Sequence, residues 1–168
     1  MQWSRELNRN VDWIDVFTNL FYTLTNNFKL IQFHYKLWHR ISTCRYMRHK
    51  IKIDLESPLC SLCEEEIETL DHIFLHCKHT TEFIERVNQF INSKIDRAYR
   101  DTNLYYRITL AHTDNRINFF NAVANWFISK KFQSKSPLIF PAFINEVKLS
   151  LLGEKVSISS SFRNIFSS

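Results

Sequence analysis

Three cysteines and one histidine lie close together between positions 60 and 77, with the spacing C-x2-C-x8-H-x4-C. Two cysteines separated by two residues chelate one ion from a tight turn, and a His and a Cys five positions apart complete a tetrahedron from the start of a helix. Zn²⁺ suits three thiolates and an imidazole, and four protein ligands leave no open position for catalysis. The sequence therefore predicts one structural Zn²⁺ per chain. The predicted ligands are Cys60, Cys63, His72 and Cys77.

Other interpretations of these residues remain open at this point. A Cys-x-x-Cys pair also occurs in redox proteins, although there it normally accompanies a βαβ unit, which the sequence does not indicate. Cys77 and Cys44 are also compatible with buried core thiols. His76 and His79 are nearby alternatives to His72 as the fourth ligand. The start of the chain carries no apolar secretory segment, so the cysteines are expected to be ligands or free thiols before disulfides.

Acidic side chains fill the segment between the expected ligands. They are most simply interpreted as a solvated surface, because nothing pairs them with a base or with an open metal position. Such a loop would repel phosphate, so we do not expect it to be the main contact with a nucleic acid. The residues are Glu64, Glu65, Glu66, Glu68 and Asp71.

The positive charge of the chain is concentrated in one segment. The formal net charge is +5, and no Asp or Glu occurs from Val16 to Ile53. Removing the seven basic residues of this segment from the 22 in the chain leaves 15 against 17 acidic residues, a net of −2. The expected nucleic-acid contacts are Lys29, Lys36, Arg40, Arg45, Arg48, Lys50 and Lys52.

A basic segment without acidic residues favours RNA or DNA as a partner, because Lys and Arg neutralise phosphates and release counterions. Aromatic residues within it, Tyr35, Trp38 and Tyr46, are expected to lie in the core, with stacking on unpaired bases as the alternative. The alternative for the charges is an ordinary solvated helix surface, but exposed helices usually mix both signs.

Composition favours a helical protein. The chain has 168 residues, 45% of them hydrophobic and 15 of them Phe, but only one Gly and three Pro. Hairpin turns depend on Gly, so a many-stranded sheet is disfavoured. We predict a mainly α fold, a small helical domain with an inserted CCHC zinc knuckle.

Hydrophobic spacing predicts helices over 11–24, 29–45, 81–91 and 114–131, and a last one beginning near Pro141 and ending at Gly153. Asp114 or Asn115 is expected to cap the fourth, and periodicity is lost over 46–59. The predicted organisation is an N-terminal helical lead-in (1–28), a basic helix with the zinc module (29–91), a C-terminal helical segment (92–152) and a Ser-rich disordered tail (153–168). The state of 92–114 is left open.

No run of 18 apolar residues occurs, so no membrane span is expected. With no secretory signal either, the expected location is intracellular, in the nucleus, the cytoplasm or both. Nothing in the sequence points to a small-molecule substrate.

Three segments of the chain together resemble a known family. FHYKLWHRI at 33–41 is followed by SPLCSLC at 57–63 and EIETLDHIFLHC at 66–77. This order resembles the zinc-binding region near the C-terminus of non-LTR (LINE-type) retrotransposon reverse transcriptases, and the similarity covers about Lys29 to Phe90. A looser similarity continues through two later helical segments.

The resemblance implies that the CCHC residues are zinc ligands. It also implies a role in holding element RNA or target DNA during target-primed reverse transcription, together with the remainder of a reverse transcriptase. It does not imply polymerisation, because polymerases need paired carboxylates for two metal ions and the aspartates here are scattered. A nuclease signature led by Pro-Asp is also not visible. We therefore expect a non-catalytic fragment of an RNA-directed DNA polymerase polyprotein.

Overall fold

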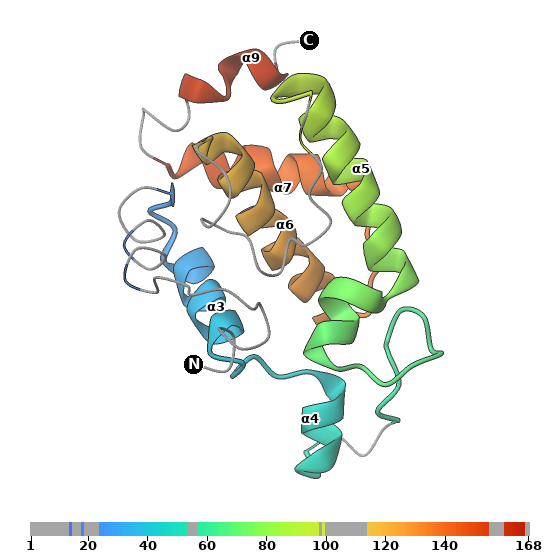
Figure 1. Ribbon diagram of the computed structural model, residues 1–168. Helices are drawn as coiled ribbons and strands as arrows, with labels where there is room; N and C mark the ends of the chain where they lie inside the picture. The colour runs from blue at the N-terminus through green and yellow to red at the C-terminus, as the bar shows by residue number, and fades with distance from the viewer. Residues whose placement is uncertain are drawn as a thin grey trace.

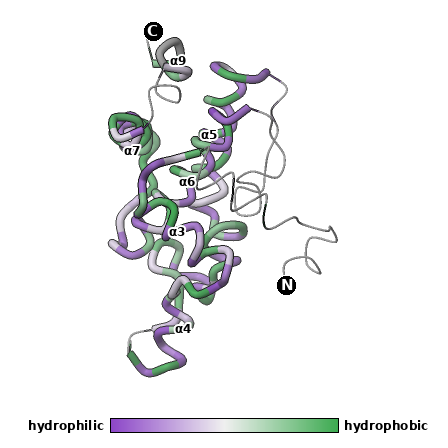
Figure 2. Tube along the Cα trace, turned by 90° about the vertical axis from the view of Figure 1, so that its left-hand side faces the viewer, coloured by the Kyte–Doolittle hydropathy of each residue, from purple (hydrophilic) through white to green (hydrophobic). Residues whose placement is uncertain are grey.

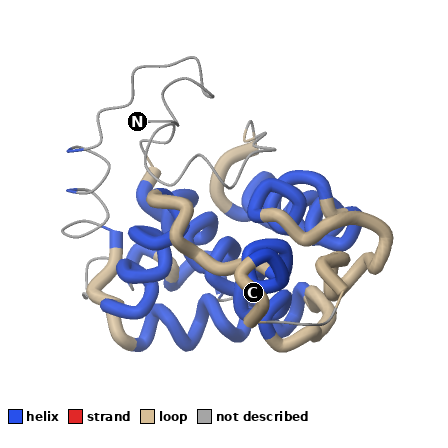
Figure 3. The backbone as a smooth tube through the Cα atoms, turned by 90° about the horizontal axis from the view of Figure 1, so that it is seen from below, coloured by secondary structure: helices blue, strands red, loops and turns tan. Residues whose placement is uncertain are grey.

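The computed structural model describes residues 14, 18, 24–53, 57–97, 99, 114–154 and 160–166. Within these residues the fold is helical, without named strands, and a single antiparallel bridge joins Leu59 to Ile67 (Figure 3). The prediction of a mainly α fold with a Cys/His cluster is confirmed. Most of the helix predicted over 11–24 and most of segment 92–114 lie outside the described residues.

The named elements are α3 (Phe28–Trp38), α4 (Arg45–Lys50), the π-helix η2 (His72–His76), α5 (Lys78–Lys94), α6 (Asn115–Gln133), α7 (Phe140–Leu152) and α9 (Arg163–Phe166). In Figure 1, α6 crosses the middle of the molecule, with α3 on one side and α5 on the other. The short helix α4 lies at one end of the molecule, below the other helices (Figures 1 and 2).

Helix α3 is shorter than the sequence suggested. It begins at Phe28, directly after the cap residue Asn27, whose side chain accepts hydrogen bonds from the backbone N–H groups of Lys29 and Leu30. It was predicted to reach Arg45 but ends at Trp38, because Arg40 adopts a left-handed φ of 54°. The chain then turns, and a separate helix, α4, occupies part of the segment predicted to lack periodicity.

The end of α3 is a Schellman motif, in which the N–H of Ile41 bonds to Lys36 O at 2.9 Å and that of Arg40 to Leu37 O. Glycine normally occupies the left-handed position of this motif. The same pattern ends α4 at Lys52 (φ 59°) and α6 at Lys135 (φ 51°), so three basic residues stand where glycine would be least strained.

The one glycine of the chain is used differently. Gly153 ends α7 as predicted, but its φ of −92° is right-handed, and a methyl group added there would meet only Ser150 O at 3.9 Å. The helix therefore ends here without the left-handed conformation that usually favours glycine at such a position. Pro141 lies in the first turn of α7, as expected.

Helix α6 is the centre of the core. Asp114 caps its first turn by accepting from Arg116 N at 2.8 Å. The apolar residues whose spacing predicted this helix are buried, but so are polar residues beside them, namely Asn118, Asn121 and Asn125. Because α6 packs against α3, η2 and α7, a single stripe could not describe it. The predicted segments 29–91 and 92–152 therefore share one hydrophobic core.

Phenylalanines fill the space between α5, α6 and α7. Phe143 of α7 lies 5.3 Å from Phe83 and 5.7 Å from Phe127 between ring centroids. Phe162, in the segment predicted to be a disordered tail, is 2% exposed and packs edge-on against Phe119, with 5.4 Å between the ring centroids. Large apolar side chains within residues 160–166 therefore extend the core.

A buried histidine joins α3 to α6. His34 is fully buried, and its Nε2 donates a hydrogen bond to Ala122 O at 3.1 Å. Burial lowers the pKa of His34 from 6.5 to about 3, although the Ala122 carbonyl acts in the opposite direction. The imidazole is therefore neutral at physiological pH and serves as a structural link. Among the described helices, none is long and apolar enough to cross a membrane.

Candidate metal centre

The loop around the first two cysteines is shaped by short-range hydrogen bonds. Cys60 Sγ accepts from the backbone N–H groups of Leu62 and Cys63, each at 3.4 Å. The backbone around it pairs with the returning chain, since Cys60 N donates to Glu66 O at 2.7 Å. Glu64, directly after the turn, has a left-handed φ of 59°. These contacts hold both thiols on the inner side of the turn.

The other two residues are presented by a π-helix. His72 and Cys77 lie five positions apart, which in an α-helix would separate them by about 140° around the axis. In η2 the N–H of Cys77 instead bonds to His72 O at 2.8 Å, an i to i+5 bond that widens the turn. This brings both side chains to the same side of the segment, facing the loop.

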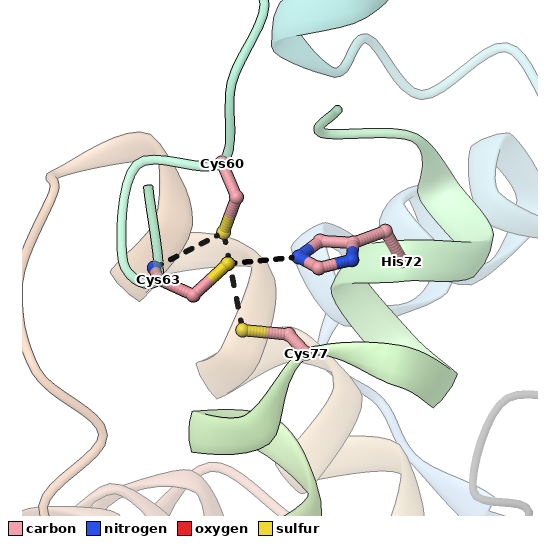
Figure 4. Close-up of side chains that lie close together, drawn as sticks. All are labelled: Cys60, Cys63, His72 and Cys77. Atoms are coloured by element: carbon pink, nitrogen blue, oxygen red, sulfur yellow. Dashed lines mark hydrogen bonds between the residues drawn. The ribbon is translucent and has the colours of Figure 1, made fainter. Parts of the chain in front are cut away.

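The four side chains converge on one buried point (Figure 4). Cys63 Sγ lies 3.4 Å from His72 Nε2, and Cys60 Sγ lies 3.9 Å from Cys77 Sγ. All four donor atoms lie within 4.8 Å of one another. The alternatives from the sequence are not part of this cluster: His76 is exposed, His79 is half-buried, and Cys44 is buried elsewhere.

The separations suit tetrahedral zinc. A Zn–S bond of about 2.3 Å places two sulfurs about 3.8 Å apart, and a sulfur and an imidazole nitrogen about 3.5 Å apart. The measured 3.9 Å and 3.4 Å match these values closely. A donor set of three sulfurs and one nitrogen also favours zinc over hard cations, which prefer oxygen ligands.

The orientation of His72 is set by an acidic residue that the sequence had suggested was only solvated. Glu66 Oε2 lies 2.9 Å from His72 Nδ1, and a carboxylate accepts from the protonated nitrogen. This contact assigns the proton to Nδ1 and leaves the lone pair on Nε2, the atom that faces Cys63. Carboxylates that orient metal-binding histidines in this way also raise their basicity.

The thiols influence each other's protonation. A hydrogen bond to Cys77, together with burial, raises the pKa of Cys60 to about 12. The same hydrogen bond lowers the pKa of Cys77, helped by backbone N–H groups at the start of α5. Several thiolates so close together repel one another, so a dication at their centre removes the main obstacle to ionising all three.

Glu68 is the largest departure from the sequence interpretation of the acidic loop. It is 3% exposed, and its carboxylate accepts from Arg45 N at 3.0 Å and from Ser61 N at 2.9 Å. Ser61 in turn donates to Phe132 O at 3.2 Å. Glu68 therefore joins the cysteine loop to the first residue of α4, and Ser61 joins the loop to the end of α6. No sequence signal separated Glu68 from its four acidic neighbours.

The seven predicted basic contacts fall into different places. Lys29 and Lys36 line one cavity beside α3, whereas Arg45 and Arg48 line a second, adjoining cavity. Arg40 lies 4.0 Å from Asp71. Lys50 and Lys52, at the far end of α4, line neither cavity. The segment therefore does not form one uniform surface.

The comparison with protein families agrees with this geometry. A model described as zinc-binding in reverse transcriptase matches residues 3–83, a little under half of the chain. Residues 3–83 are a zinc-binding domain of the reverse-transcriptase type. The matched region contains the whole CCHC cluster, as the resemblance noted above predicted. Helices α6 and α7 lie beyond it, although α6 packs directly on η2. Searches of curated proteins and of solved structures gave no match.

Proposed function

We propose that Cys60, Cys63, His72 and Cys77 bind one structural Zn²⁺. The observation that supports this most strongly is the convergence of four donor atoms within 4.8 Å in a segment matched by a zinc-binding family. The ion would complete the loop and anchor it to η2 and to the start of α5. With four protein ligands it would have no open position, so we assign it no catalytic role.

Native mass spectrometry tests the site directly. We expect one zinc per purified chain, released by a chelator, and much weaker zinc binding after Cys60→Ser with Cys63→Ser. Cys44→Ser is the matched control, since Cys44 is also buried but lies outside the cluster. A folded wild-type chain that carries no zinc after incubation with the ion would refute the assignment.

We also propose that the zinc domain acts as a non-catalytic nucleic-acid-binding part of a reverse transcriptase, assisting RNA or DNA binding in target-primed reverse transcription within the cell. The acid-free basic segment supports this, because exposed Lys29, Lys36 and Arg48 lie on the two helices that flank the turn after α3. Phosphate binding by such groups is strongly salt-dependent.

Fluorescence anisotropy with labelled RNA and DNA tests this proposal. Replacing Arg40, Arg45 and Arg48 by Glu should abolish binding. Because Arg45 also donates to Leu59 O beside the zinc loop, the double variant Lys29→Gln with Lys36→Gln provides a second test that leaves the loop intact. Salt-insensitive binding, or wild-type affinity in both variants, would contradict the proposal.

An alternative function is a zinc module that contacts a protein. Apolar side chains are exposed on and after α4, namely Tyr46, Met47, Ile51 and Ile53. Under this alternative, the chain would bind the remainder of a reverse transcriptase, and replacing Ile51 and Ile53 by Ser would weaken that complex. Nucleic-acid binding would be absent or insensitive to salt.

A further inference from the structure

Two neighbouring cavities adjoin each other between α3, α4 and the C-terminal half of α6. One has a volume of about 490 Å³ and the other of about 200 Å³. Four residues line both of them, which shows that the cavities share a wall and are parts of one groove. The shared residues are Ser42, Thr43, Ser129 and Gln133. All four carry side chains that can donate a hydrogen bond to a phosphate or sugar oxygen.

Basic residues from three separate elements line this groove. Lys29 and Lys36 of α3 line the larger cavity, and Arg45 and Arg48 of α4 line the smaller one together with Lys135. Only one carboxylate, Glu68, lines either cavity, and its oxygens accept from two backbone N–H groups. The groove therefore has a strong excess of positive charge, to which Lys135, just after α6, contributes from outside the region matched by the zinc-binding family.

Lys135 is held in a strained position. It has a left-handed φ of 51° at the end of α6, where glycine would be favoured. A residue kept in a strained conformation beside a groove motivates a functional assignment for its side chain. The favourable interaction of a cation with the end of a helix is the structural alternative, which the experiment below separates.

The groove also contains an aromatic wall. Trp126 of α6 is half-buried and lines the larger cavity, and its ring packs edge-on against Phe33 at 5.3 Å. The bases of a duplex are stacked inside the helix and do not reach such a ring. Unpaired bases stack on aromatic side chains, in channels whose basic residues follow the backbone.

We propose that this groove binds a single-stranded segment of RNA or DNA, with Lys135 contacting a backbone phosphate and Trp126 stacking on a base. This inference rests on the proposed nucleic-acid-binding function and specifies the strand state and the contacts of α6. Because Ser129 and Gln133 come from α6 and Lys135 follows its C-terminus, the binding surface would extend beyond the matched zinc domain.

The test uses the zinc-loaded full chain and labelled 15-nucleotide oligo(U), oligo(dT) and a duplex of equal length. Wild-type protein should bind either single strand more tightly than the duplex. Tighter binding of oligo(U) would assign the groove to RNA, and tighter binding of oligo(dT) would assign it to DNA. Equal binding of the two would assign it to the phosphates they share.

Lys135→Gly should weaken single-strand binding about three- to five-fold at 0.15 M salt and lower the salt slope by about one contact. Its thermal midpoint should stay the same or rise, because glycine relieves the left-handed strain. If Lys135 had only a structural role, its replacement would not weaken binding while leaving the thermal midpoint unchanged or higher. Arg86→Gln is the matched control, because it also removes one positive charge, from an exposed position on α5. It should leave binding unchanged.

Trp126→Leu should weaken binding about ten-fold, with the fold verified by circular dichroism. Wild-type affinity and salt slope in Lys135→Gly, or tighter binding of the duplex, would overturn the groove assignment while leaving nucleic-acid binding in place. Failure of the wild-type chain to bind any of the three probes would instead remove the proposed function itself.

Discussion

The cysteine loop and the phenylalanine core lie side by side but are stabilised by different interactions. In the loop, polar contacts converge on four donor atoms, and buried Glu68 ties the segment to α4. In the core, rings from α5, α6 and α7 pack against one another, as Phe83, Phe127 and Phe143 do. The difference indicates that metal binding should control the order of the loop, whereas apolar packing should control the global stability.

The largest expected effect is that of removing zinc. Structural zinc contributes on the order of 10 kcal/mol of folding free energy in small zinc modules. In hydrogen exchange followed by mass spectrometry, a chelator should accelerate exchange of amides in 57–77 by orders of magnitude. Amides in the middle of α6 should remain the slowest in the chain. Equal acceleration in both regions would show that loop and core do not differ in this way.

The next largest effect concerns the core. Phe143 is fully buried, so Phe143→Ala should lower the free energy of unfolding by about 3–5 kcal/mol in urea titrations. Zinc affinity, measured by competition with a chelator in the folded state, should change only slightly. Phe28→Ala, at a position 70% exposed, is the matched control and should have little effect on either quantity. A large loss of zinc affinity in Phe143→Ala would couple the two regions more tightly than we propose.

Acid should weaken the link between α3 and α6. The pKa of His34 is lowered to about 3 in the folded chain from the ordinary 6.5 of an imidazole, so between these pH values the unfolded chain binds a proton that the folded chain does not. Stability from this residue is therefore fully present above pH 6.5 and falls as the pH decreases, by about 1.4 kcal/mol per pH unit.

Urea titrations between pH 7 and pH 5 measure this slope. Zinc release also depends on pH, but it affects all variants equally. The informative quantity is therefore the difference between variants in how steeply the free energy of unfolding changes with pH. His34→Asn should flatten the dependence, whereas His49→Asn, at an exposed position, should keep it. Identical slopes in the two variants would show that His34 is not the acid-sensitive group.

The smallest expected effects come from backbone conformation. Glu64 has a left-handed φ of 59° in the loop, so Glu64→Gly should stabilise the zinc-loaded chain by about 0.5–1 kcal/mol. In α7, Gly153→Ala should stabilise by a similar amount, because its φ is right-handed and its surroundings are open. Thermal unfolding measures both. A destabilising effect of Glu64→Gly would mean that the Glu64 side chain contributes more than the strain costs.

Several features could be predicted because they depend on neighbouring residues. The cysteine and histidine spacing restricts which side chains can meet, and His72 joins the cluster as predicted. The cap at Asp114 follows from local hydrogen bonding. The end of α3 was missed, because its left-handed position carries Arg40 instead of the glycine that usually marks such an end. The zinc occupancy and the nucleic-acid contacts stay predictions.

The sequence by itself determined a helical chain, a CCHC cluster and an acid-free basic segment, because composition, periodicity and ligand spacing act over short distances along the chain. Only the tertiary structure decided that Glu68 is buried, that Phe162 joins the core and that Lys135 lies in the same groove as Arg45 and Arg48. These outcomes depend on which distant segments pack together. Side chains of one type, such as the glutamates of the cysteine loop, acquire different roles when tertiary packing buries one of them and leaves the others exposed.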